Sequence, residues 1–175
     1  MTLGALLLGL LALLPAEAQP VKYRVTGLFN REREADLQEA VKKLTDVTVA
    51  GIDLEHGEAT FSYDPAKLFP KVQPKDLVER FDNLLRSASG QTFGIKPLST
   101  TPKDKLVRIE IPVLVLDCKG CCLAAYDSIA KIDGVEQATA SFKDGLMTAL
   151  IDPDKTNRAA LEEALKKRGV TLKTP

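Results

Sequence analysis

The apolar and polar positions of this chain follow a pattern that occurs twice. The second copy lies 88 residues after the first, so that Val25 aligns with Val113 and Asp64-Pro65 aligns with Asp152-Pro153. The alignment needs no gap over residues 25–65. Because a self-match at one fixed spacing indicates a repeated structural unit, the sequence predicts two copies of the same fold.

Each copy alternates between the periodicities of strands and helices. Ile109, Ile111 and Val113 occupy every second position, which predicts a half-buried strand. Leu37 and Val41 lie one helical turn apart on an apolar stripe, which predicts an amphipathic helix. Further strands are predicted at 47–54, 59–63, 92–97, 135–142, 147–151 and 170–173, further helices at 74–87 and 158–167, and glycine-containing hairpin turns at 55–58 and 143–145.

The order of elements in each copy is therefore β-α-β-β-α-β, which is the ferredoxin-like split βαβ arrangement. We expect an α+β protein with two such domains, each a four-stranded antiparallel sheet with two helices on one face. The first domain is predicted at 21–98 and the second at 106–174. The polar segment 99–105, which contains Pro102, is the predicted linker.

Residues 1–18 have the pattern of a secretory signal peptide. The apolar run 3–14 is shorter than the roughly 20 residues that a membrane-spanning helix needs. The small-residue pattern Ala16-Glu17-Ala18 follows it and predicts cleavage after Ala18. We therefore expect a periplasmic or extracellular protein, in a compartment where thiols oxidise, with no membrane insertion after cleavage.

The composition excludes several classes of function. The 24 basic and 24 acidic side chains cancel, which argues against nucleic-acid binding by bulk electrostatics. The single histidine, His56, lies in a predicted hairpin turn, where we expect it to be exposed. No glycine-rich phosphate loop, pair of catalytic carboxylates or Ser/His/Asp set stands out, so we expect a binding protein and not an enzyme.

All three cysteines, Cys118, Cys121 and Cys122, lie within five residues, at the predicted start of the first helix of the second copy. The positive end of the helix dipole favours a thiolate, which is both a nucleophile and a metal ligand. Two soft sulfur atoms suit Cu(I) or Hg(II), and also Zn(II) if other ligands are added. A closed structural zinc site normally needs four protein ligands, which this loop does not supply.

The second copy resembles the heavy-metal-associated domain over residues 106–174. This family occurs in copper chaperones, in the N-terminal regions of copper-transporting P-type ATPases and in periplasmic mercury-binding proteins. The resemblance implies that Cys118 and Cys121 are the metal ligands, and that the partner is a cysteine-bearing metal donor or acceptor protein or a membrane transporter. It is carried by Leu116-Asp117-Cys118-Lys119-Gly120-Cys121, Asp133-Gly134-Val135 and Ile151-Asp152-Pro153.

The first copy resembles the same domain in its scaffold, at 25–28, 41–44 and 63–65. Asn30 and Arg33 stand where the two cysteines of the motif would be. Neither side chain can replace a thiolate for a soft metal. We therefore expect a metal-silent copy that acts as a packing partner, a spacer or a docking surface.

Cys122 has three open interpretations: a third metal ligand, an intermolecular or redox thiol, or a neutral small residue. Its counterpart in the first copy, Glu34, lies off the apolar stripe, so we expect Cys122 near the surface. The expected function is capture of a soft ion, Cu(I) first, and its transfer by ligand exchange. The alternatives are a thiol–disulfide redox protein, a passive structural disulfide, and an interaction module whose thiols are incidental.

Overall fold

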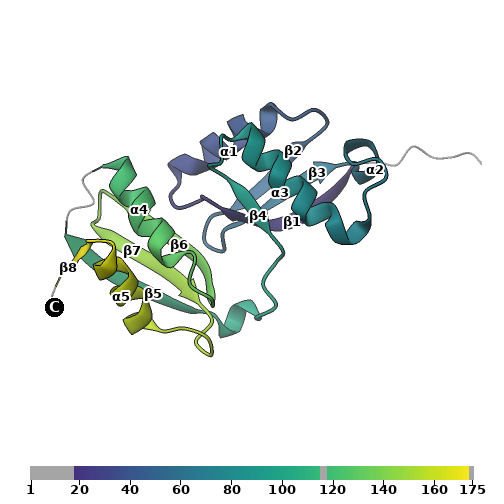
Figure 1. Ribbon diagram of the computed structural model, residues 1–175. Helices are drawn as coiled ribbons and strands as arrows, with labels where there is room; N and C mark the ends of the chain where they lie inside the picture. The colour runs from purple at the N-terminus through teal and green to yellow at the C-terminus, as the bar shows by residue number, and fades with distance from the viewer. Residues whose placement is uncertain (1–17, 115–117, 174–175) are drawn as a thin grey trace, which may run out of the picture.

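A computed structural model of the protein describes residues 18–114 and 118–173. Residues 1–17 of the predicted signal peptide, residues 115–117, which include the first two residues of the motif that carries the resemblance, and residues 174–175 lie outside these ranges. The described chain forms two sheets with their own helices, joined by one connecting segment (Figure 1). Across this part of the chain, no helix combines the length and the apolar character needed to cross a bilayer.

Apart from one additional short helix in the first domain, both domains have the predicted β-α-β-β-α-β order. The strand order of the first sheet, β2-β3-β1-β4, is repeated in the second as β6-β7-β5-β8. Every strand pair is antiparallel. The elements of the first domain are β1 (Gln19–Thr26), α1 (Glu32–Lys42), β2 (Thr48–Asp53), β3 (Glu58–Tyr63), α2 (Pro65–Leu68), α3 (Leu77–Ala88) and β4 (Gly94–Lys96). Those of the second are β5 (Val107–Leu114), α4 (Lys119–Ile129), β6 (Val135–Ser141), β7 (Leu146–Ile151), α5 (Arg158–Lys167) and β8 (Thr171–Leu172).

The predicted elements agree with the structure except near proline and at strand ends. The helix predicted from residue 74 begins at Leu77, after a 3₁₀ turn at Pro74–Asp76. The short helix α2 was not predicted. It forms because Asp64 caps its start by accepting a hydrogen bond from the Ala66 amide at 2.9 Å, and because Pro65 has the backbone angle that a first helical residue needs.

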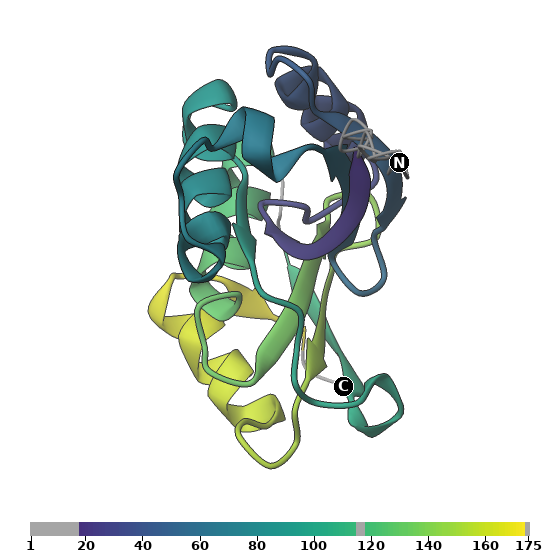
Figure 2. The same ribbon diagram turned by 90° about the vertical axis from the view of Figure 1, so that its right-hand side faces the viewer.

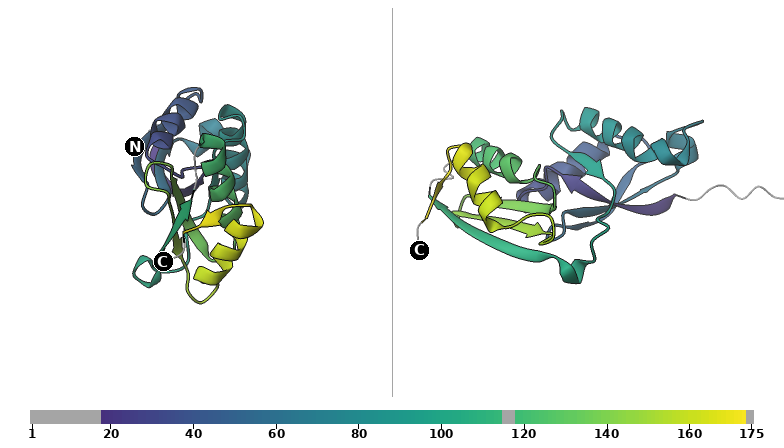
Figure 3. Two further views of the ribbon diagram at one scale, coloured as in Figure 1. Left: turned by 90° about the vertical axis from the view of Figure 1, so that its left-hand side faces the viewer. Right: turned by 60° about the horizontal axis from the view of Figure 1, so that its bottom comes forward.

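The two domains are joined by a buried interface as well as by the connecting segment, which Figure 2 shows running from the first domain above to the second below. The loop between β1 and α1 of the first domain lies against α4 and β6 (Figures 1 and 3). Phe29 from this loop is only 6% exposed and belongs to the apolar core of the second domain. Its ring centroid lies 5.3 Å from that of Tyr126 on α4.

Backbone groups of the β1–α1 loop are paired with the second domain. The Gly27 amide donates to the Tyr126 hydroxyl at 2.8 Å, and the Ala140 amide of the edge strand β6 donates to the Phe29 carbonyl at 2.9 Å. Gly27 has a φ of +88°, and a Cβ there would collide with the Thr92 carbonyl oxygen. Only glycine can adopt this backbone conformation beside Thr92 without strain, and the conformation places the Gly27 amide at the interface.

Two polar side chains complete the interface. The Gln137 side-chain amide donates to the carbonyl oxygens of Leu28 at 2.9 Å and Leu54 at 3.0 Å. Arg24 pairs with the Glu136 carboxylate at 2.5 Å and donates to the Glu136 carbonyl oxygen at 2.8 Å. Because these groups are buried or nearly so, each carbonyl would lose a hydrogen bond from the other domain if the domains separated.

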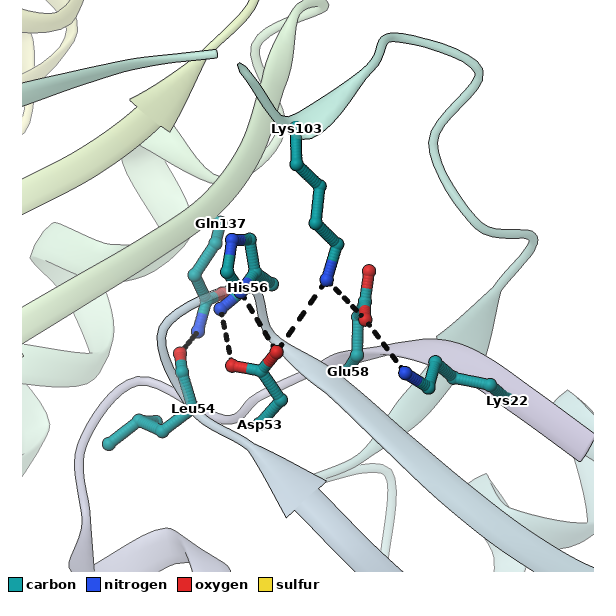
Figure 4. A network of polar contacts seen from close by, with 7 residues as sticks. All are labelled: Lys22, Asp53, Leu54, His56, Glu58, Lys103 and Gln137. Atoms are coloured by element: carbon teal, nitrogen blue, oxygen red, sulfur yellow. Dashed lines mark hydrogen bonds and ion pairs between the residues drawn. The ribbon is translucent and has the colours of Figure 1, made fainter. Parts of the chain in front are cut away.

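The connecting segment is fastened to both domains. Lys103 lies 2.8 Å from the Glu58 carboxylate and 3.6 Å from Asp53, which also contacts His56 at 2.8 Å (Figure 4). The Thr101 hydroxyl donates to Asp152 of the second domain at 2.8 Å. His56 is therefore not the exposed turn residue that we expected, because it is partly buried and pairs with Asp53.

The ion pairs among Asp53, Glu58 and Lys103 stabilise the charged forms of Asp53 and Lys103. Burial raises the pKa of Asp53, but the hydrogen bonds from His56 and the charge of Lys103 outweigh burial and hold this pKa below its ordinary value of 3.8. Burial lowers the pKa of Lys103, but the hydrogen bond and charge of Glu58 outweigh it, so that the pKa of Lys103 is raised. Both charged forms are therefore stabilised near neutral pH.

Gln137→Ala is expected to lower the free energy of unfolding by about 1–3 kcal/mol, because it leaves the Leu28 and Leu54 carbonyl oxygens without their side-chain donor. The measurement is denaturant unfolding at pH 7. Gln38→Ala, on the exposed face of α1, is the matched control and is expected to be nearly neutral. Equal effects of the two substitutions would show that the interface carbonyls do not depend on Gln137.

Lys103→Met is expected to destabilise the protein at pH 7 by up to about 1 kcal/mol, because the pairs of Lys103 are partly exposed. The pKa of Asp53 is lowered in the folded state, so its contribution is present above the unfolded value and is lost as the pH falls through the folded value. The difference between wild type and variant should therefore shrink at pH 3. Lys105→Met, on the same segment, is the control, and a difference that grows in acid would contradict this assignment.

Candidate metal-binding site

Cys118 and Cys121 lie where the sequence predicts them, at the start of a helix in the second domain. Cys118 is the N-cap residue of α4, with an extended backbone, and its Sγ accepts a hydrogen bond from the Cys121 amide at 3.0 Å. Cys118 is exposed and Cys121 is half-buried. The Cys118 sulfur thus faces the positive end of the helix, which stabilises the thiolate form that binds metals.

The sulfur atoms of Cys118 and Cys121 lie within bonding distance of each other. Cys118 and Cys121 form a disulfide in the structure, with their Cα atoms 5.1 Å apart. A loop that brings two sulfur atoms within bonding distance also brings them close enough to share one ion after reduction. The sequence left the oxidation state open, and the structure describes the oxidised one. Reduction, which adds two electrons and two protons, must precede metal binding.

Cys122 is not near the surface, contrary to our expectation. It is 2% exposed and lies in the same apolar cluster as Ala125 and Ile129, which are three and seven residues further along α4. Burial raises the pKa of Cys122, and the charge of Glu32, in the first turn of α1, raises it further. The expectation failed because it used the first copy as a guide, and in the first copy no second domain covers this face of the helix.

The first domain repeats the geometry of the cysteine loop without its sulfur atoms. Asn30 accepts a hydrogen bond from the Arg33 amide at 3.1 Å, just as Cys118 does from Cys121. The Arg33 guanidinium lies 4.5 Å from the centroid of the Phe93 ring and 5.4 Å from that of Phe29. A fixed cation therefore stands where the second cysteine of the motif would be. Of the three roles expected for this copy, the structure shows packing.

The described residues contain no larger ligand set. Within 18–114 and 118–173, no three or more His, Cys, Asp or Glu side chains are grouped so as to hold a metal ion. The sequence predicted the cysteines as site residues but did not identify the residues that connect the domains, which are Phe29, Tyr126 and Gln137. The one available signal was Gln137, a polar residue at a strand position where the first copy has Val49.

The comparison with known sequences confirms the resemblance to proteins that carry heavy-metal-associated domains. The chain is 24% identical over 183 aligned residues to the human protein Copper-transporting ATPase 2. The alignment covers 87% of this chain and 12% of that protein, so the chain spans about an eighth of the length of this relative. No protein-family model matches the chain.

Solved structures similar to this chain include single-domain and two-domain proteins. The N-terminal soluble domains of Bacillus subtilis CopA cover 90% of this chain and 93% of their own, at 19% identity and a TM-score of 0.37. The CopZ metallochaperone covers 38% of this chain and all of its own, at 21% identity and a TM-score of 0.38. Oxidized MerP from Ralstonia metallidurans CH34 covers 39% of this chain and 94% of its own, at 20% identity and a TM-score of 0.37. At these TM-scores, the superpositions add nothing to the topology described above.

Cys118→Ala is expected to lower the free energy of unfolding of the reduced protein by about 1 kcal/mol relative to Cys118→Ser, because serine can replace the capping sulfur and alanine cannot. Asn30→Ala, which removes the equivalent hydrogen bond to the Arg33 amide just before α1, should cost a similar amount. The measurement is denaturant unfolding under reducing conditions. Equal stability of the alanine and serine variants at position 118 would contradict the capping role.

Proposed function

We propose that the protein is a non-enzymatic carrier of a soft metal ion, Cu(I) first and Hg(II) or Zn(II) as further candidates, that binds through the Cys118 and Cys121 thiolates. The observation that carries this proposal is the convergence of the two sulfur atoms at an accessible helix N-terminus. The human relative is a copper-transporting ATPase, which supports copper as the first metal to test.

The electrostatics of the loop suit a two-thiolate complex. Cu(I) bound by two thiolates carries one net negative charge, which the positive end of the α4 dipole and the Cys121 amide that donates to Cys118 Sγ partly offset. Binding releases the protons of both thiols into solution, so that the affinity falls as the pH is lowered. The metal is cargo in this proposal, and the protein supplies a place where it can be held and given up.

Transfer to a cysteine-bearing partner would proceed by ligand exchange. Cys118 is exposed and Cys121 is half-buried, so an incoming thiolate can approach the metal from the Cys118 side. For each thiol of this protein that leaves the metal and takes up a proton, one thiol of the partner loses a proton and binds. The oxidation state of the metal does not change, and no external electron donor is needed once the disulfide is reduced.

We also propose that the protein works in the periplasm or outside the cell. The apolar run 3–14 and the Ala16-Glu17-Ala18 pattern support this location. The disulfide is consistent with a compartment in which thiols oxidise. In that compartment, capture would require a reducing partner or a metal supplied to the protein while its cysteines are still reduced.

A thiol–disulfide redox protein is the second candidate, and the Cys118–Cys121 disulfide is the observation that favours it. In that reaction, a thiolate of a substrate would attack one sulfur of the disulfide, form a mixed disulfide and release the other as a thiolate. A measured reduction potential in the range of known oxidoreductases, together with catalysed reduction of insulin, would support this candidate over the metal carrier.

Anaerobic titration of the reduced protein with Cu(I), in competition with a chromophoric chelator, is expected to show one tight site per chain. Cys118→Ser/Cys121→Ser should lower the affinity by at least about a thousandfold, because two thiolate ligands are lost. The matched control is Asn30→Ser/Arg33→Ser, at the same positions of the first domain, which should bind as wild type does. Wild-type affinity in the double cysteine variant would refute the proposed function.

A further inference from the structure

Cys122 lies beside the two candidate ligands in sequence but faces a different part of the molecule. Successive residues of a helix point about 100° apart, so Cys121 and Cys122 cannot share one face of α4. Cys122 lies on the face that carries Ala125, Tyr126 and Ile129, all of which are buried. Its backbone amide donates to the Cys118 carbonyl at 3.1 Å, which holds it within the first turn.

The internal repeat shows what buries this face. Glu34 and Gln38 occupy the equivalent positions to Cys122 and Tyr126 on α1, and there Glu34 is partly exposed and Gln38 is exposed. The neighbouring strands differ in the same way, because most of β6 is buried and most of β2 is not. The same helix and strand are thus covered in one copy and uncovered in the other.

The cover on the second copy is the β1–α1 loop of the first domain. Phe29 is the buried aromatic residue of this loop and shares one apolar cluster with Cys122 and Tyr126. The Phe29 carbonyl is fixed by the Ala140 amide at 2.9 Å, and the adjacent Leu28 carbonyl by Gln137 at 2.9 Å. Because these two neighbouring carbonyl groups both bond to β6, the Phe29 ring is held in the seam between the domains, where the loop meets α4 and β6.

We propose that Phe29 is a specificity-determining residue, which holds Cys122 in the seam between the domains and so limits the metal centre to the two thiolates of Cys118 and Cys121. The inference rests on the proposed function of the cysteine pair. It gives the cysteine-free domain a role in the chemistry, because that domain sets how many sulfur atoms the metal can reach.

The number of sulfur ligands matters for a carrier. Two thiolates suit Cu(I) or Hg(II), and they leave room for the incoming thiolate of a partner. A third thiolate from the same chain would occupy that place and slow the transfer. For Cys122 to become a ligand, its thiol would have to leave the apolar cluster, which costs burial free energy.

The ligand count is tested by X-ray absorption at the copper edge on the reduced full chain loaded with one equivalent of Cu(I). We expect two sulfur atoms per copper in wild type and the same spectrum in Cys122→Ser. Phe29→Ala is expected to show a third sulfur atom, and Phe29→Ala/Cys122→Ser to return to two. A change of the wild-type spectrum on Cys122→Ser would overturn the inference, and so would two sulfur atoms in a folded Phe29→Ala variant.

Accessibility of Cys122 is tested without metal, by maleimide alkylation in the Cys118→Ser/Cys121→Ser background. Phe29→Ala should increase the alkylation rate at least about tenfold, because the seam opens locally more often. Phe142→Ala, which removes an exposed ring of the same size, is the matched control and should leave the rate unchanged. Circular dichroism checks that each variant is folded, and Phe29→Leu replaces Phe29→Ala if the latter unfolds.

The two proposals can fail separately. Absence of Cu(I) binding by the reduced wild-type chain would refute the carrier function, whatever the alkylation rates are. Tight binding by the reduced wild-type chain, together with Cys122 alkylation rates that are equal with and without Phe29→Ala in the Cys118→Ser/Cys121→Ser background, would leave the carrier function intact and refute the role of Phe29.

Discussion

The arrangement of this protein depends on how one sheet edge is covered. The outer edge of β6 presents backbone groups that must be paired or hydrated, and exposed edges of this kind invite association with other chains. Here the β1–α1 loop of the first domain lies along that edge, where Ala140 donates to the Phe29 carbonyl and Gln137 to the Leu28 carbonyl. The same contact gives α4, the helix that begins at the cysteines, a neighbour on its flank.

The two loops at the start of α1 and α4 show how one local structure serves two purposes. Asn30 and Cys118 each accept a hydrogen bond from the amide three residues later, so the fold of the loop does not require sulfur. In the second domain the capping atom is also a soft ligand at an accessible helix end. In the first domain the loop instead carries Phe29 into the neighbouring core, and the place of the second sulfur is taken by Arg33, stacked between aromatic rings.

Most of the secondary structure followed from periodicity because the pattern was strong and occurred twice. The helix at Arg158–Lys167 has the predicted bounds, and the strands differ from prediction by a residue or two at their ends. The start of α3 was displaced by the 3₁₀ turn at Pro74–Asp76, and α2 went unpredicted because four residues are too few to show a helical period. The place of Cys118 and Cys121 at a helix start was predicted because Cys-x-x-Cys precedes an apolar stripe.

The sequence by itself determined the repeat, the split βαβ order of each domain, the place of the cysteine pair and the loss of cysteine from the first copy. These features depend on local spacing, which periodicity records. The tertiary structure decided that Cys122 is buried and that His56 is paired with Asp53. It also decided that the cysteine-free domain packs against the helix of the cysteines. Burial depends on which surface of another domain arrives from far along the chain, and no spacing within a single copy carries that information.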